Sequence, residues 1–227
     1  MNEKPLLIFD HDGTLHNSMF VFGPAMQKGV KWLEEQGYGK IENFSYERLE
    51  KLLGLVAYDI WKSLKYDLSD EAIEKVSAFV NLEMRKGLNE GKAKWYDGAS
   101  RMLDKLKSMG YKMVILSNCD KALASFYWDY FHMQNWFEKF YDSESYDNKQ
   151  KSDIIKEIII ERKSEAIMIG DRYIDHESAK SVNIPFIGCI YGFCADGELD
   201  GADEIAESVE KIPDLVEKIA INRYKMQ

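Results

Sequence analysis

The sequence contains few cysteines, no long hydrophobic run and no excess of positive charge. The three cysteines, Cys119, Cys189 and Cys194, are too few and too irregularly placed for a disulfide framework or a zinc site, which indicates a reducing compartment. The apolar stretch near the N-terminus is too short for a signal peptide, and no run approaches membrane-spanning length. A formal net charge of -9 repels nucleic-acid backbones and anionic lipids. We therefore expect a cytoplasmic protein that binds neither nucleic acid nor membranes.

The residues that are present favour a folded chain of alternating strands and helices. With 227 residues, of which 45% are hydrophobic, the chain can bury a sizeable core. Consecutive apolar residues, as expected for strands covered on both faces, occur at 6–9, 112–116, 166–169 and 184–190. Helical spacing lies between these runs, as in the segment 102–109, which stops at Gly110. This alternation predicts an α/β fold with a parallel sheet.

One long segment interrupts the alternation. From about residue 18 to residue 90 the sequence has only helical patterns and no convincing strand. We interpret this segment as an all-α insertion into the α/β unit. The predicted division is therefore an α/β core made of residues 1–16 and 92–227, with a helical domain formed by residues 17–91.

Polar residues follow the predicted strands, at the edge where open parallel sheets bind their ligands. They are Asp10, Asp12, Gly13 and Thr14 after the first run, Ser117, Asn118 and Cys119 after the second, and Gly170, Asp171, Arg172 and Asp175 after the third. Lys149 and Lys151 precede the helix that leads into the third run. Carboxylates crowded at one rim repel one another unless a cation lies among them, and Mg2+ prefers oxygen ligands. Because phosphate oxygens can reach such a metal, a hydroxyl and a lysine together, the set indicates phosphoryl transfer.

The first pair of acids has a spacing that suits this chemistry. Side chains alternate along a strand with period two, so Asp10 and Asp12 are expected to face one reacting centre. One carboxylate can attack phosphorus, while the other protonates the leaving oxygen and then deprotonates water. Gly13 allows a tight turn that brings a backbone amide close to phosphate.

Four stretches of the chain together resemble a known family. They are "FDHDGTLHNS", "VILSN", "KSDIIK" and "MIGDRYIDHESA". In order and approximate spacing, these stretches resemble the four motifs of the haloacid dehalogenase superfamily. The likeness covers essentially the whole chain and is greatest for the phosphoglycolate-phosphatase-like branch, which carries a helical cap after the first motif. This resemblance implies a Rossmann-like core, with the inserted segment as the cap.

The resemblance also implies a role for each matching residue. Asp10 would be the nucleophile that becomes an aspartyl phosphate, and Asp12 the general acid and base. Ser117, Asn118 and Lys151 would bind the phosphate. Mg2+ would be held by Asp10, the Asp12 carbonyl and Asp171, with Asp175 in support.

Four positions need separate interpretation. His11 stands where the family more often has an apolar or aromatic residue, and strand alternation points it away from the metal, so we expect it to pack or to contact the cap. Lys151 is preferred over Lys149 as the phosphate ligand, because "KSDIIKEI" reads as a helix start. Cys119 is expected to be an inert packed thiol rather than a redox-sensitive one, and Arg172 to form a structural ion pair.

The predicted function is a Mg2+-dependent phosphatase that hydrolyses a small phosphorylated metabolite, a phosphate monoester, through an aspartyl phosphate. Two alternatives stay open: a sugar-phosphate phosphomutase, which keeps both aspartates, and a binding or regulatory module that has lost catalysis. No arginine adjoins Gly54 in the inserted segment, which weakens the case for a second anionic group on the substrate. The sequence gives no indication of oligomeric state.

Overall fold

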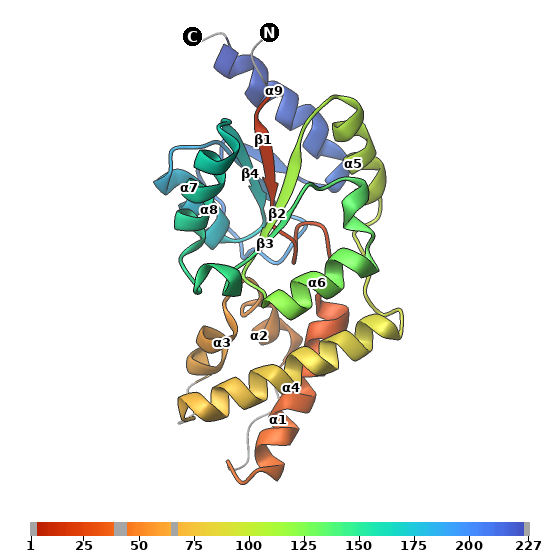
Figure 1. Cartoon of the computed structure of the whole chain (residues 1–227), viewed down its shortest axis with the longest axis vertical. Helices are drawn as coiled ribbons and strands as arrows, with labels where there is room; N and C mark the ends of the chain where they lie inside the picture. The colour runs from red at the N-terminus through yellow and green to blue at the C-terminus, as the bar shows by residue number, and fades with distance from the viewer. Residues whose placement is uncertain (1–3, 39–44, 65–67, 225–227) are drawn as a thin grey trace. The chain divides into compact units, whose positions relative to one another are not determined.

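The computed structural model describes residues 4–38, 45–64 and 68–224 of the chain. The chain divides into two compact units, one made of Met1–His16 with Trp95–Gln227 and the other of Asn17–Lys94. We call the first the core unit and the second the inserted unit. The inserted unit interrupts the core unit after the first strand, which is visible in Figure 1 as the orange and yellow segment.

A parallel sheet forms the centre of the core unit. Its strand order is β3-β2-β1-β4-β5-β6, and every neighbouring pair is parallel. The strands are β1 (Leu6–Phe9), β2 (Met113–Ser117), β3 (Phe140–Asp142), β4 (Ala166–Gly170), β5 (Phe186–Cys189) and β6 (Glu204–Ala206). Because β1 lies between β2 and β4, residues that follow these three strands emerge at one edge of the sheet. The predicted Rossmann-like α/β fold is confirmed.

Two strands of this sheet were not predicted from the sequence. Both β3 and β6 have three residues, and they occupy the two edges of the sheet. Their sequences, FYD and EIA, are too short and too polar to show the continuous apolar run expected of a strand covered on both faces. Each therefore lacks the pattern that identifies the four inner strands.

Helices cover both faces of the sheet, which accounts for the apolar runs. The helices of the core unit are α5 (Ala99–Ser108), α6 (Lys121–Tyr130), α7 (Lys151–Arg162), α8 (Tyr173–Ser181) and α9 (Ile212–Tyr224), with short 3-10 helices at Met133–Asn135, Glu144–Tyr146 and Val209–Lys211. Leu6 and Ile8 of β1 belong to the hydrophobic cluster that Ile154 of α7 and Ala179 of α8 complete. Figure 1 shows α7 and α8 together on one side of the sheet and α5 with α9 on the other.

The described part of the inserted unit is helical and contains no strand. Its helices are α1 (Met19–Glu35), α2 (Tyr46–Glu50), α3 (Ala57–Ser63) and α4 (Asp70–Asn89). The long helices α1 and α4 pack closely at Gly29, where an added Cβ would lie 2.6 Å from a methyl group of Val80. Among the described residues, none of the helices combines the length and apolar character needed to cross a membrane.

Candidate active site

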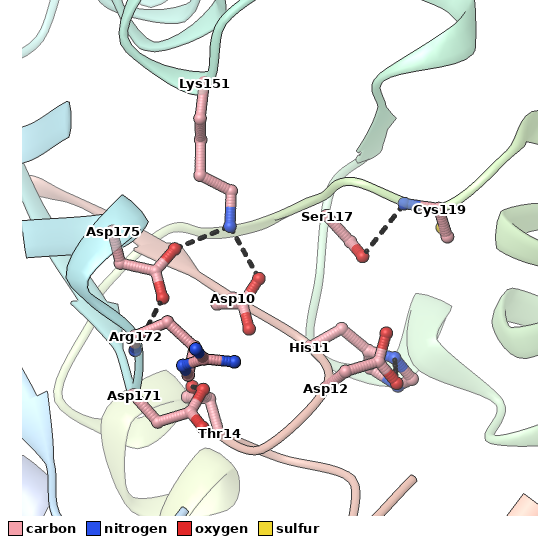
Figure 2. Close-up of polar contacts among 10 residues, drawn as sticks. All are labelled: Asp10, His11, Asp12, Thr14, Ser117, Cys119, Lys151, Asp171, Arg172 and Asp175. Atoms are coloured by element: carbon pink, nitrogen blue, oxygen red, sulfur yellow. Dashed lines mark hydrogen bonds and ion pairs between the residues drawn. The ribbon is translucent and has the colours of Figure 1, made fainter. Parts of the chain in front are cut away.

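Three carboxylates from separate parts of the chain lie together at the carboxyl edge of the sheet. Asp10 follows β1, Asp171 follows β4, and Asp175 lies in the first turn of α8. One oxygen from each lies within 4.8 Å of the others, and all three residues are buried. Figure 2 shows them in one group. The predicted convergence of acids from distant segments is therefore present in the structure.

Backbone and hydroxyl donors fix two of these carboxylates. Asp171 accepts a hydrogen bond from the Thr14 hydroxyl at 3.2 Å and another from the backbone N–H of Phe193 at 2.7 Å. Asp175 accepts one from the backbone N–H of Arg172 at 3.1 Å, across the start of α8. Hydrogen bonds from neighbouring turns therefore fix the carboxylates of Asp171 and Asp175, in addition to the elements that carry these residues.

Glycines permit the close approach of these turns. Gly13 has a φ of +89°, and an added Cβ there would lie 2.0 Å from Oδ2 of Asp171. Added Cβ atoms at Gly170 and Gly192 would lie 2.4 Å from Asp175 and from Asp171. Any side chain at these positions would displace a carboxylate.

One lysine is directed into the acid cluster. Lys151, the first residue of α7, is buried, and its Nζ donates to Oδ1 of Asp10 and to Oδ1 of Asp175, each at 2.6 Å. Lys149 instead lies on the surface, where it pairs with Glu157 at 2.7 Å. The structure thus places Lys151, and not Lys149, beside the acids.

The charges in this cluster do not balance. Burial raises the pKa of the Asp10 carboxyl to about 7, and the charge of Asp175 adds to this effect, although the Lys151 ammonium opposes it. Burial and the charge of Asp10 likewise raise the pKa of Asp171 well above its usual range. One ammonium cannot neutralise three buried carboxylates, so the donor set fits a divalent cation with a preference for oxygen.

Asp12 lies near this cluster but contacts different groups. Its Oδ1 is 3.3 Å from Nδ1 of His16 and 3.5 Å from Nδ1 of His11, and its side chain is 17% exposed. Alternation predicts that both acids face one centre, and this stays a prediction: Asp12 lies beyond the end of β1, in the turn closed by main-chain bonds between residues 11 and 16. Burial alone would raise the pKa of Asp12, but the neighbouring His11 and His16 imidazoles hold it well below its usual range.

His11 packs in the core unit against aromatic side chains. It is fully buried, and its ring centroid lies 4.5 Å from that of Tyr127 and 5.8 Å from that of Phe131. This position agrees with the expectation that His11 packs rather than takes part in catalysis. Burial also lowers the pKa of the neighbouring His16 to about 4.

The residues after β2 lie at the same edge of the sheet. Ser117 is the last residue of β2 and is buried, and its Oγ accepts from the backbone N–H of Cys119 at 3.4 Å. Asn118 follows it and is partly buried. Burial and the charge of Asp12 raise the pKa of the Cys119 thiol, which agrees with an inert cysteine. Figure 2 shows Ser117 in the same view as Asp10, with a dashed line from its hydroxyl to the backbone nitrogen of Cys119.

Arg172 forms the structural ion pair expected of it. Its Nε donates to Oε1 of Glu198 at 2.8 Å, and both side chains are largely buried. Reasoning from the sequence missed the role of Gly192 and Phe193, which hold Asp171. A usable signal was present, because these residues follow the predicted strand 184–190 and so lie at the same edge of the sheet.

Comparison with known proteins identifies the family. The haloacid dehalogenase-like hydrolase family matches residues 7–189. The chain is 25% identical to phosphoglycolate phosphatase of Aquifex aeolicus over 196 residues, which are 83% of this chain and 85% of that protein.

Solved structures agree in fold. A protein described as a predicted phosphatase from Clostridium acetobutylicum superposes with a TM-score of 0.79 at 26% identity, covering 96% of this chain and 99% of the other. A predicted phosphoglycolate phosphatase from Haemophilus somnus gives a TM-score of 0.81 at 17% identity, covering 95% and 99%. The predicted resemblance is confirmed, and so is the prediction of an enzyme of this type. The chain belongs to the haloacid dehalogenase-like hydrolases.

Proposed function

We propose that this protein is a Mg2+-dependent phosphatase that hydrolyses a small-molecule phosphate monoester through an aspartyl phosphate. The observation that carries the proposal is the buried cluster of Asp10, Asp171 and Asp175 around the ammonium of Lys151. Family membership supports it, as does similarity to a protein named phosphoglycolate phosphatase. The inserted unit corresponds to the predicted cap domain, residues 17–91.

Asp10 is the nucleophile in this scheme. A carboxylate oxygen of Asp10 forms a bond to phosphorus as the bond to the ester oxygen breaks, which leaves an aspartyl phosphate and an alcohol. Asp12, which in this scheme is protonated when the substrate is bound, gives its proton to the departing oxygen. It then takes a proton from water, which attacks phosphorus and releases inorganic phosphate and the free Asp10 carboxylate.

Oxygen donors of the chain hold the metal in the proposal. They are the carboxylates of Asp10 and Asp171 and the backbone carbonyl of Asp12, with Asp175 in a supporting position. A bound Mg2+ supplies positive charge that favours ionised Asp10 and stabilises the phosphoryl oxygens in the transition state.

The phosphate is bound by three other side chains. The Ser117 hydroxyl and the Asn118 amide donate hydrogen bonds to its oxygens, and the Lys151 ammonium neutralises their charge. Lys151 also fixes the Asp10 carboxylate for attack, since Nζ already contacts Oδ1 at 2.6 Å.

The test is hydrolysis of p-nitrophenyl phosphate with and without Mg2+. We expect activity that requires Mg2+, is lost with EDTA, and falls at least about 1,000-fold in Asp10→Asn. Asp153→Asn, a surface acid on α7 paired with Lys156, is the matched control and keeps full activity. Acid-quenched single turnovers with labelled substrate should trap phosphate on the wild-type chain. Unchanged rates in Asp10→Asn would refute the nucleophile assignment.

A panel of phosphate esters then separates hydrolysis from transfer and identifies the substrate class. Release of one inorganic phosphate per ester consumed supports the phosphatase. Conversion of one sugar phosphate isomer into another without phosphate release would instead identify a phosphomutase. Phosphoglycolate and neutral sugar phosphates belong in the same panel, because their rates report whether a second anionic group is recognised.

A further inference from the structure

A second group of metal-ligand atoms lies beside the acid cluster and shares no side chain with it. Nδ1 of His11, Nδ1 of His16 and a carboxylate oxygen of Asp12 come together, with ligand atoms of the three residues within 4.8 Å of one another. Both histidines are fully buried, whereas the Asp12 side chain is 17% exposed and opens the group to solvent. The Asp12 carboxylate is shown beside His11 in Figure 2.

A tight turn of the backbone builds this group. The N–H groups of Leu15 and His16 both donate to the carbonyl of His11 at 3.0 Å, and the N–H of Gly13 donates to the carbonyl of His16 at 2.8 Å. The turn brings the two imidazole rings to a centroid distance of 5.1 Å. Main-chain bonds therefore fix the backbone positions of the two histidines.

The imidazole nitrogens lack the partners that buried polar atoms normally have. Within the described residues, three imidazole nitrogens have no hydrogen-bond partner, namely both nitrogens of His11 and Nε2 of His16. An unpartnered buried polar atom costs about 1–3 kcal/mol, and a metal held through the two Nδ1 atoms would give His11 Nδ1 the partner that it lacks. Aromatic side chains of Tyr127 and Phe131 enclose the rings and restrict them to this orientation.

The two separations from Asp12 to the histidines match edges of a small coordination sphere. Ligand atoms about 2.0–2.1 Å from a tetrahedral ion are separated from one another by about 3.3–3.4 Å. The separations from Asp12 Oδ1 to the two Nδ1 atoms are 3.3 Å and 3.5 Å. Two nitrogens and one carboxylate suit Zn2+, Co2+ or Ni2+ and are poor ligands for Mg2+, which prefers oxygen. The fourth position would be open to water on the exposed side of Asp12.

We propose that His11, Asp12 and His16 form a second metal site that binds Zn2+ or a similar transition-metal ion, separate from the site of Asp10, Asp171 and Asp175. Binding there occupies the Asp12 carboxylate. It therefore inhibits the enzyme, a consequence that rests on the proposed role of Asp12 as general acid and base, whereas the binding itself does not.

Metal binding is measured first, without reference to activity. Equilibrium dialysis of the whole chain against Zn2+, with excess Mg2+ to fill the acid site, is expected to give one tightly bound Zn2+. His16→Leu and His11→Leu fill the aromatic pocket without a ligand atom, and each should weaken Zn2+ binding at least about 100-fold. His132→Asn, which alters an exposed histidine, is the control and should bind Zn2+ as the wild type does.

An acid-site variant separates the two sites. Asp171→Asn removes a carboxylate of the acid cluster and leaves His11, Asp12 and His16 intact, so it should retain tight Zn2+ binding. Loss of Zn2+ binding in Asp171→Asn, or wild-type binding in both histidine-to-leucine variants, would overturn the proposal. Should the leucine variants fail to fold, Co2+ added to the wild type decides the matter. Intense visible absorption supports a four-coordinate site with nitrogen ligands, and its absence excludes one.

Inhibition is the second readout. With Mg2+ saturating, Zn2+ near its measured dissociation constant should suppress phosphatase activity of the wild type and of His132→Asn to the same degree. Zn2+ that binds through the histidines but leaves activity intact would argue against Asp12 as the acid and base while leaving the site itself established. An inactive enzyme that still binds Zn2+ through the histidines would count against the proposed function alone.

Discussion

Replacement of Lys151 tests whether its ammonium compensates the buried acids. Nζ lies 2.6 Å from carboxylate oxygens of both Asp10 and Asp175, and Asp171 completes a group of acids within 4.8 Å. At an effective dielectric constant of about 20, two unit charges at that separation repel by roughly 3.5 kcal/mol. Protonation relieves part of this repulsion. Removing one partner from a buried ion pair typically costs about 3–5 kcal/mol.

We therefore expect Lys151→Met, which keeps the apolar stem, to lower the free energy of unfolding by about 3–5 kcal/mol in EDTA. Lys149→Met removes a charge two residues away, in a surface pair whose side chains are each 45% exposed, and should cost at most about 1 kcal/mol. Urea denaturation at neutral pH, followed by circular dichroism, measures both values.

Adding Mg2+ should show whether Lys151 stabilises the fold by compensating the charge of the acids or only by packing. A ligand at 100 times its dissociation constant adds about 2.7 kcal/mol of stability. Because Mg2+ and the ammonium relieve the same repulsion, we expect Mg2+ to stabilise Lys151→Met more than it stabilises the wild type. Equal stability of Lys151→Met and Lys149→Met in EDTA would refute the reasoning, as would a Lys151→Met penalty that Mg2+ leaves unchanged.

Three further predictions concern the turn, the core and the inserted unit. Gly13→Ala, with φ at +89° and an added Cβ 2.0 Å from Asp171, should abolish Mg2+-dependent activity, and Mg2+ titration by calorimetry should show weakened binding. Ile158→Ala, at a fully buried position of α7, should cost about 2–5 kcal/mol in urea denaturation, whereas Ile160→Ala, 73% exposed on the same helix, should change little. Two lysine ammonium groups hold the pKa of Glu83 below its usual range, so this carboxylate adds stability above the unfolded pKa that is lost as pH falls through the folded pKa. Glu83→Gln should therefore cost only about 1 kcal/mol at pH 7, because both lysines are more than half exposed. The cost should shrink as the pH falls through the folded pKa of Glu83, and a cost that does not change with pH would contradict this.

The inner strands could be predicted because burial on both faces leaves a signature in the sequence. The runs that became β1 and β4 have no polar residue, and both strands are fully buried. The edge strands β3 and β6 have three residues each and include acidic side chains, so no apolar run marks them. Parallel pairing also explains why the sequence alone predicts that Asp10 and Asp171 lie together, since β1 and β4 end at the same edge of the sheet.

The contacts of Asp12 could not be predicted in the same way. Alternation along a strand is a local rule, and it ends where the chain leaves the sheet. The turn that follows β1 is closed by main-chain bonds between His11, Leu15 and His16, and these bonds decide where the Asp12 carboxylate lies. The choice of Lys151 over Lys149 followed from recognising the helix start, and the structure places that lysine beside Asp10.

The contact between Lys151 and Asp10 joins residues 141 positions apart, across the whole inserted unit. A chain in which helices have formed but β4 has not docked on β1 has no such contact, and closing so long a loop is slow compared with forming helices. During refolding, recovery of the helical signal should therefore precede recovery of catalysis. The rate at which turnover recovers would then report the rate of the last long-range step of folding.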